Sequence, residues 1–417
     1  MARRRSVTWL LAATLLIAGL PSASVRVSGQ EPLPRVAPSA ARLAAAPLER
    51  ITDLLEESVA RQRIAGAVVG VARRGRVAYL EAVGVQDLAT RAPMTERTLF
   101  RTYSMTKAVT AVAVMILREE GRFELSDPVS RYLPEFADVA VVDEGGATRP
   151  PVRPITIEHL LMHTSGLSHR SSPEYQQASV RQRTQSLAQF VENVVRVPLR
   201  FDPGERFLYS ESSTVLGRLV EVVSGQPFDN FLRARVLDPL AMHDTSFWVE
   251  PEDQARLTTV YRHVDGGGLE PIEVEPEVPY TERPELLEGA VGLVSTVPDF
   301  LRFAQMLANG GELSGVRILR GGTVGLLTRN GLSDEILRTR RGGTGWALAS
   351  VSVVVDPAAA GSGAHAGEYR WDGSAGTEFW VDPSTGTILV TMWQSSPANP
   401  DQLRQRITEL VRDAVQP

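Results

Sequence analysis

The chain has 417 residues, of which 43% are hydrophobic, and a formal net charge of −5 at neutral pH. This length and composition fit one large globular domain or two moderate ones, and a mildly acidic chain lacks the basic bias of nucleic-acid-binding proteins. The sequence contains no cysteine, which excludes disulfides, thiolate chemistry and cysteine-bound zinc.

The N-terminus predicts export. Three arginines at positions 3–5 precede an apolar stretch at 7–20, and a proline with small residues follows, which is the order of a secretory signal. The apolar stretch is shorter than the roughly 20 residues that a membrane-spanning helix needs. We therefore assign residues 1–29 to a signal peptide and expect a periplasmic or secreted protein with no stable membrane span after cleavage.

The mature chain is expected to begin with a helix and a hairpin. Residues 30–47 are rich in proline and alanine and are predicted to form a linker before a domain at 48–417. Residues 48–62 have apolar side chains at helical spacing, whereas 65–72 and 77–83 are short apolar runs on either side of an Arg- and Gly-rich turn. These patterns predict one helix followed by two antiparallel strands.

The next element contains the only lysine of the chain, Lys107, in the run Ser104-Met105-Thr106-Lys107. An arginine never loses its proton in a protein, whereas a buried lysine can become a neutral amine and act as a base. The apolar residues that follow, up to Gly121, predict a buried helix. Positions i and i+3 share one helix face, so the amine can approach the hydroxyl of Ser104. The first turn also leaves N–H groups free to bind an oxyanion.

Helical segments dominate residues 125–284, and strand patterns return only at the following positions: 346–355, 365–371, 377–381 and 387–393. An amphipathic helix is expected at 401–415. The predicted fold is α+β, with an antiparallel sheet flanked by helices and built from 48–124 and 285–417, and with 125–284 inserted as a mostly helical subdomain. Such a junction favours a small-molecule pocket near Ser104.

Other candidate residues are ambiguous from the sequence alone. Tyr209 follows a Pro-Gly turn and could relay a proton, although a packed aromatic is the simpler interpretation. His159 and His163 have a spacing that could hold a metal, but the glutamate of the zinc-protease motif is absent between them. We expect neither a metal nor a cofactor. Residues 370–377 predict a tight hairpin or a strand edge that approaches a ligand.

Several of these motifs together resemble the serine β-lactamase-like superfamily, which includes class C β-lactamases, DD-peptidases and, most similar, the family VIII carboxylesterases. The resemblance spans most of the mature chain. Its motifs are Ser104-Met105-Thr106-Lys107, Leu160 to Leu167, Tyr209-Ser210, Gly289 to Thr296 and Trp371-Asp372-Gly373.

The resemblance implies roles for these positions. Ser104 would be the acylated nucleophile, Lys107 its general base and Tyr209 the residue that passes the proton to the leaving group. The backbone N–H groups of Ser104 and Ser374 would form the oxyanion hole.

Two departures from the β-lactamase pattern concern the substrate. Tyr209-Ser210-Glu211 replaces Tyr-X-Asn, and Trp371-Asp372-Gly373 replaces Lys-Thr-Gly, so we expect Glu211, Trp371 and Gly373 to contact substrate and to disfavour an anionic one. Glu211 also raises a difficulty, because a carboxylate near Lys107 stabilises the ammonium. Either Glu211 points away, or Tyr209 ionises and acts as the base.

The sequence therefore predicts an exported serine hydrolase that cleaves small carboxylic esters, with no nucleic-acid partner. A β-lactamase, a D-amino-acid peptidase or an acyltransferase of the same superfamily remains the alternative. A non-catalytic binding module is a further alternative, against which the joint presence of Ser104, Lys107 and Tyr209 argues.

Overall fold

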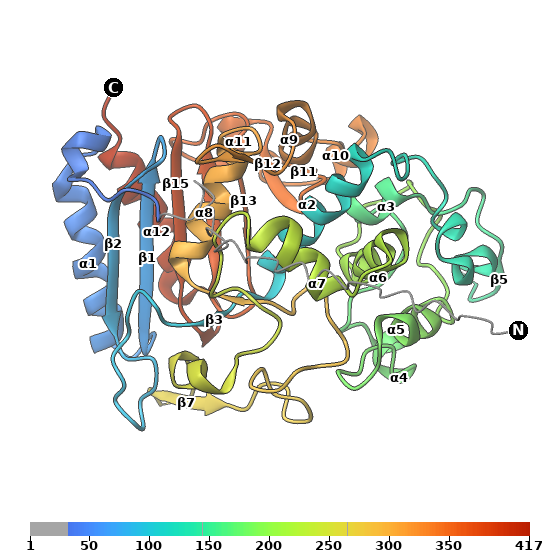
Figure 1. Ribbon diagram of the computed structural model, residues 1–417, viewed down its shortest axis with the longest axis horizontal. Coiled ribbons are helices and arrows are strands. Elements are labelled where there is room, and N and C mark those ends of the chain that lie inside the picture. The colour runs from blue at the N-terminus through green and yellow to red at the C-terminus, as the bar shows by residue number, and fades with distance from the viewer. Residues whose placement is uncertain (1–31, 144, 265) are drawn as a thin grey trace, which may run out of the picture.

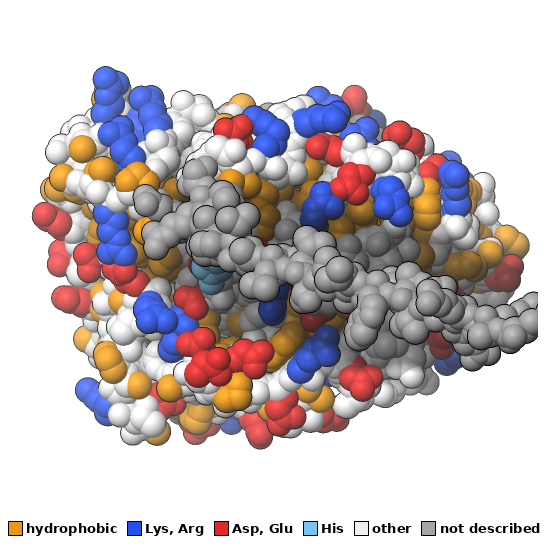
Figure 2. Space-filling view, in the orientation of Figure 1, with side chains coloured by type: hydrophobic (Ala, Val, Ile, Leu, Met, Phe, Trp, Pro, Cys, Tyr) orange, Lys and Arg blue, Asp and Glu red, His pale blue; other side chains and the backbone are white. Residues whose placement is uncertain are grey.

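The computed structural model describes residues 32–417 except 144 and 265 (Figure 1). The predicted signal peptide, residues 1–29, lies outside the described residues. Among the described residues, no helix combines the length and the apolar character needed to cross a bilayer. On the face shown in Figure 2, acidic and basic side chains are mixed rather than separated.

A seven-stranded sheet forms one side of the molecule, in the order β11-β12-β13-β14-β15-β1-β2, and every pairing within it is antiparallel. Its strands are β1 (Gly66–Arg73), β2 (Arg76–Gly84), β11 (Thr344–Ala347), β12 (Val351–Val354), β13 (Tyr369–Asp372), β14 (Glu378–Asp382) and β15 (Thr387–Met392). β1 pairs with β15, with Val69 opposite Thr391. The predicted sheet built from both ends of the chain is therefore confirmed.

Helices cover both faces of this sheet (Figure 1). The helices α1 (Ala45–Ala60) and α12 (Leu403–Ala414) pack together on one face, and α8 (Val297–Ala308) packs on the other. The alternation of side chains along β14 serves both layers, because Trp380 joins the core under α1 and α12 whereas Phe379 packs against Phe300 of α8. Both faces are apolar for this reason.

The helical subdomain lies beside the sheet and contains α3 (Ile157–Leu161), α4 (Pro173–Gln177), α5 (Leu187–Val194), α6 (Ser212–Ser224) and α7 (Phe228–Leu232). The helix α2 (Thr106–Glu119) contacts both α6 and α9 (Gly321–Thr328), and its residues from Thr106 to Leu117 are all buried. The predicted α+β architecture with a helical insertion is confirmed.

Short elements complete the fold. They are β3 (Phe100–Arg101), β4 (Val141–Val142), β5 (Thr148–Arg149), β6 (Val260–His263), β7 (Leu269–Ile272), β8 (Val294–Ser295), β9 (Glu312–Leu313), β10 (Val316–Arg317), β16 (Ser395–Ser396), α10 (Asp334–Thr339), α11 (Pro357–Ala360), and 3-10 or π turns at Pro38–Ala41, Tyr103–Met105, Val129–Arg131, Pro134–Asp138, Arg233–Leu237, Pro251–Arg256 and Pro400–Gln402.

The structure differs from the sequence expectation at two places. The stretch 30–47, predicted as a linker, packs against the folded unit from residue 32 on, because Leu33 and Leu43 are buried and Arg35 bridges to Val77 of β2. The single strand expected at 346–355 is two strands, β11 and β12, separated by a turn in which Ser350 has a φ of 55°.

Candidate active site

Ser104 lies in the 3-10 turn Tyr103–Met105, directly before α2. Upstream, β3 pairs with β8, and Thr102 donates two hydrogen bonds to the carbonyl oxygen of Leu293, from its N–H at 2.9 Å and its hydroxyl at 2.8 Å. Tyr103 has a φ of 45°, a left-handed backbone conformation that residues other than glycine rarely adopt. Such conformations cluster at functional sites. The turn thus presents Ser104 at the N-terminal end of a buried helix.

Lys107 approaches Ser104 from the first turn of α2. Its Nζ lies 3.3 Å from Ser104 Oγ and donates a hydrogen bond to the carbonyl oxygen of Ala290 at 2.9 Å. The side chain is completely buried. The contact between amine and hydroxyl that the i, i+3 spacing predicts is therefore observed.

The segment that holds Lys107 begins at Gly289, whose carbonyl oxygen accepts a hydrogen bond from Thr110 of α2 at 2.7 Å. A Cβ atom at Gly289 would lie 2.4 Å from the carbonyl oxygen of Ser213 in α6. Only glycine fits at this close approach, because any side chain would push α2 and α6 apart. This explains the glycine at the start of the Gly289 to Thr296 motif.

Tyr209 completes the cluster from the loop that precedes α6. The centre of its ring lies 4.7 Å from Lys107 Nζ, and its hydroxyl oxygen accepts a hydrogen bond from Trp371 Nε1 at 3.2 Å. Trp346 lies edge-on to Trp371, with ring centres 4.5 Å apart. The structure therefore brings Tyr209 and Trp371, which are distant in the sequence, to the neighbouring pair Ser104 and Lys107.

His163 holds the Tyr209 loop. Its Nδ1 accepts a hydrogen bond from the backbone N–H of Ser210 at 3.1 Å, and its ring centre lies 4.8 Å from that of Tyr209. Complete burial, assisted by the charge of Lys107, lowers the pKa of His163 well below its usual value, so the ring is neutral. His159 has a separate function, since its Nδ1 accepts the N–H of Thr156 at the start of α3. Nothing in the sequence indicates the contact between His163 and the Tyr209 loop, which lies 47 residues further along the chain.

The third motif lies at the end of β13, opposite the nucleophile. A Cβ atom at Gly373 would lie 2.5 Å from the carbonyl oxygen of Thr102, so glycine is required where the turn meets the Ser104 segment. Thr377 donates its hydroxyl to the same oxygen at 3.1 Å. Ser374 is exposed in this turn.

Asp372 of the same motif is bound to the C-terminal helix. Its carboxylate forms an ion pair with Arg404 of α12, and Arg404 also donates to the carbonyl oxygen of Ala398 at 3.2 Å. Arg404 is itself buried. The helix α12 therefore holds the turn that contains Gly373 and Ser374.

Glu211 is completely buried at the start of α6. Its Oε1 accepts a hydrogen bond from Arg170 Nε at 3.1 Å. Burial alone would raise the pKa of Glu211, but the positive charges of Arg170 and Lys107 outweigh this effect and hold the pKa at about 2. From the sequence we expect Glu211 to contact substrate. In the structure its side chain is completely buried, and its carboxylate is already bound by Arg170.

A second buried carboxylate, Glu288, extends this charge network. Arg181 Nε binds Glu288 Oε1 at 2.5 Å, Arg183 lies 3.6 Å from Oε2, and Arg170 NH1 lies 3.9 Å from Oε1. Burial opposes ionisation of Glu288, but the arginines lower its pKa below the usual value. Sequence analysis did not identify these arginines, because each is one of 43 in the chain and nothing in the local pattern marks it.

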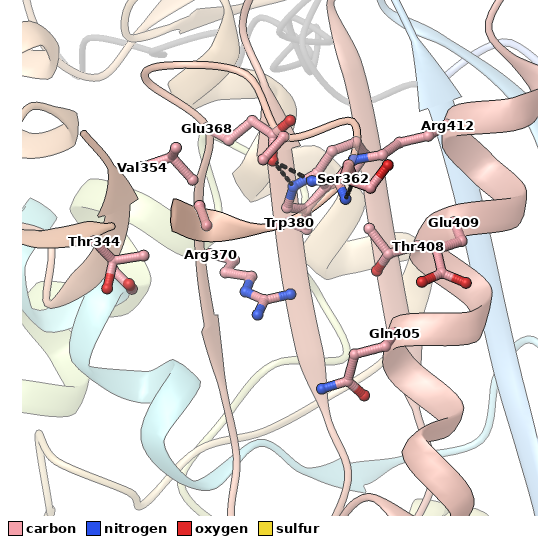
Figure 3. Close-up of a pocket in the computed structure, with 14 residues that line it drawn as sticks. Thr344, Val354, Ser362, Glu368, Arg370, Trp380, Gln405, Thr408, Glu409 and Arg412 are labelled. Atoms are coloured by element: carbon pink, nitrogen blue, oxygen red, sulfur yellow. Dashed lines mark hydrogen bonds and ion pairs between the residues drawn. The ribbon is translucent and has the colours of Figure 1, made fainter. Parts of the chain in front are cut away.

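A separate polar cavity of about 220 Å³ lies between α12 and the outer strands of the sheet (Figure 3). Within it, Glu368 accepts hydrogen bonds from Trp380 and Arg412. Ligand atoms of His365, Glu368 and Asp382 lie within 4.8 Å of one another. The carboxylates are already engaged, however, since Asp382 binds the side chains of Thr385 and His365. We assign this cluster to structural hydrogen bonding.

Comparisons with known proteins agree with this geometry. The family described as Beta-lactamase matches residues 51–413. Esterase EstB of Burkholderia gladioli is 32% identical, over 91% of this chain and 97% of EstB. Protein Rv1367c of Mycobacterium tuberculosis is 36% identical, over 80% of this chain and 86% of that protein. The solved structure of EstCE1, described as a hydrolase with promiscuous acyltransferase activity, is similar with a TM-score of 0.77 at 27% identity, over 89% of this chain and 98% of that one.

Proposed function

Because the chain belongs to the Beta-lactamase family and is a serine hydrolase, we propose that it cleaves carboxylic esters through an acyl-enzyme on Ser104. The observation that carries the proposal is the 3.3 Å contact between Lys107 Nζ and Ser104 Oγ, with the Tyr209 ring against the same amine. A nucleophile within reach of a base, and a base held by a third group, is the arrangement that activates a serine.

The reaction follows from these contacts. The neutral amine of Lys107 accepts the proton of Ser104 while Oγ bonds to the ester carbonyl carbon, and the carbonyl electrons move onto oxygen. The N–H groups of Ser104 and Ser374 donate to that oxyanion. Collapse of the tetrahedral intermediate breaks the bond to the alcohol oxygen, which takes a proton through Tyr209. Water then attacks the acyl-enzyme in the same way and releases the acid and free Ser104.

The third motif supports a neutral substrate. A lysine at the position of Trp371 would pair with a substrate carboxylate, whereas an indole has one donor and otherwise offers apolar area. That donor is used here by Tyr209. Trp371 and Gly373 thus flank the substrate, and an uncharged acyl or alcohol group fits their chemistry. The relative EstB is named an esterase.

Acyl transfer to another alcohol is the second candidate, because the similar EstCE1 structure is described as having promiscuous acyltransferase activity. A β-lactamase or D-amino-acid peptidase would use the same acyl-serine. We also propose export to the periplasm or the medium, on the signal-like N-terminus. Cell fractionation with sequencing of the mature N-terminus tests the export.

The proposal is tested by the hydrolysis of p-nitrophenyl butyrate at neutral pH, with a chromogenic cephalosporin as the competing substrate. We expect Ser104→Ala to lose at least about 1,000-fold in kcat on the ester. Ser39→Ala, at an exposed position of the turn Pro38–Ala41 that packs beside β2, is the control and retains full activity. Equal ester hydrolysis by Ser104→Ala would refute the acyl-enzyme, and faster turnover of the cephalosporin than of the ester would favour a β-lactamase.

A further inference from the structure

The base of the proposed reaction has a negative charge close to it. Glu211 is completely buried two residues after Tyr209, whose ring centre lies 4.7 Å from Lys107 Nζ, and the charge of Lys107 is among the causes that lower the pKa of Glu211. A carboxylate next to an amine stabilises the ammonium form. An ammonium cannot accept the proton of Ser104. The chain therefore needs a group that offsets the charge of Glu211.

Arg170 is that group by position. Its Nε donates to Glu211 Oε1 at 3.1 Å, and its NH1 lies 3.9 Å from Glu288 Oε1. Its side chain is 22% exposed, which is too little for water to screen the pair strongly. Arg181 and Arg183 bind Glu288, so that Arg170 remains available to Glu211.

We propose that Arg170 is a positioning residue whose ion pair with Glu211 draws the carboxylate charge away from Lys107 and keeps the amine able to accept the proton of Ser104. The inference rests on the proposed roles of Ser104 and Lys107. It assigns to Glu211 and Arg170 together the position that a neutral asparagine has in the β-lactamase pattern.

The other groups that face Lys107 do not replace this effect. His163 is neutral and uses Nδ1 on the N–H of Ser210, and Tyr209 presents the face of its ring. His169 lies stacked on Tyr209 with ring centres 5.9 Å apart, and burial lowers its pKa although Glu211 opposes this. Ala290 contributes a carbonyl oxygen, which carries no net charge. Glu211 is the acidic partner among these neighbours.

The sequence allows a direct test, because Lys107 is the only lysine. A protein produced with ¹³Cε-lysine and a lysine-free tag gives one lysine signal, whose chemical shift follows the protonation of this amine. For Arg170→Gln we expect the midpoint of the titration to move to higher pH, so that the neutral amine at a fixed pH falls about tenfold. For Glu211→Gln we expect the midpoint to move to lower pH. The double variant should return toward the wild type.

Kinetics provide a second readout. The acid limb of the kcat profile for p-nitrophenyl butyrate should move in the same direction as the lysine signal in each variant, with KM changed less than about threefold. Arg218→Gln is the matched control, because Arg218 is 29% exposed and pairs with Glu221 on α6. It should leave both the signal and the profile unchanged.

The outcomes separate the two ideas. An unchanged lysine midpoint in both Arg170→Gln and Glu211→Gln overturns the inference, whatever the activity. If the midpoints of the two variants shift as expected but the wild-type protein shows no hydrolysis that depends on Ser104, the charge relation is supported and the proposed function is refuted. If Arg170→Gln does not fold, Glu211→Gln decides the question, because its midpoint must still move to lower pH.

Discussion

Tyr209 is the residue on which the proposed proton relay depends, and its side chain has two functional neighbours. Trp371 donates to the hydroxyl oxygen at 3.2 Å, and the amine of Lys107 lies over the ring at 4.7 Å. These contacts hold the phenol beside the amine that takes the proton of Ser104, so that in the proposed reaction a proton can pass from Lys107 through Tyr209 to the leaving alcohol.

Tyr209→Phe tests this role. The change removes the hydroxyl but keeps the aromatic packing against His163 and Trp346, so we expect kcat to fall about 100- to 10,000-fold with little change in KM. Steady-state kinetics on an aryl ester measure both constants. Tyr132→Phe, in which the lost hydroxyl binds Asp127, is the control and should retain kcat. A Tyr209→Phe variant with more than half of the wild-type kcat would assign the relay to another group.

The motifs in the sequence predicted Ser104, Lys107 and Tyr209 as site residues, whereas the residues that contact them from distant parts of the chain are visible only in the structure. The Ser104 to Lys107 spacing places two groups on one helix face, so local geometry alone brings them together. Arg170, His163 and Trp346 approach Tyr209 or Glu211 only after the subdomain folds. A sequence of 43 arginines gives no local sign of which one will pair with a buried carboxylate.

At the scale of elements, α12 supports the third motif. Arg404 contributes an ion pair to Asp372 and also donates to the carbonyl oxygen of Gly373 at 3.5 Å, next to the proposed oxyanion donor at Ser374. The turn is otherwise held by its contact with Thr102. A C-terminal helix thereby fixes a backbone N–H that is distant from it in the sequence.

Arg404→Gln should release this turn. We expect kcat to fall about tenfold, because a misplaced oxyanion donor weakens stabilisation of the transition state more than binding of the ester. Arg406→Gln is the matched control on the same helix, since Arg406 is 46% exposed and its ion pair with Glu57 is long, at 3.9 Å. Kinetics with thermal melting separate the effects. An equal loss of kcat in both variants would mean that helix stability, not the turn, is responsible.

Some elements were predictable and others were not, for local reasons. The predicted hairpin of β1 and β2 is observed, because two runs rich in apolar residues flank a turn that contains Gly75. The turn between β11 and β12 was missed, since Ser350 adopts a φ of 55° without being glycine. The helix α8 was not assigned, although it covers one face of the sheet. The linker was misassigned because alanine and proline do not reveal the burial of Leu33 and Leu43.

At the scale of the whole molecule, buried ion pairs tie stability to pH. The folded pKa of Glu211 is about 2, below its usual value of 4.5, because Arg170 and Lys107 outweigh burial. Such a depressed carboxyl contributes stability above its unfolded pKa, and this contribution disappears as pH falls from about 4.5 towards about 2. The free energy of unfolding therefore contains a term, on the order of 3 kcal/mol, that acid removes.

Thermal melting between pH 7 and pH 3 measures this term. We expect the wild-type Tm to fall steeply below pH 5, and the double variant Arg170→Gln with Glu211→Gln to fall less, because it lacks the pair that protonation breaks. Single variants would not serve, since each leaves an unpaired buried group. Parallel Tm curves for the wild type and the double variant would show that acid acts elsewhere.

The pairing of β1 with β15 has a consequence for folding of the enzyme during its synthesis. β1 (residues 66–73) leaves the ribosome long before β15 (residues 387–392), its partner in the sheet. The pairing of these two strands therefore waits for the synthesis of β15, and such long-range pairing is slow. The turn that holds Ser374 belongs to the same late segment. We expect the nascent chain to carry Ser104 without the proposed oxyanion hole until this segment has been made, so that hydrolysis begins only after β13, β14 and β15 have paired.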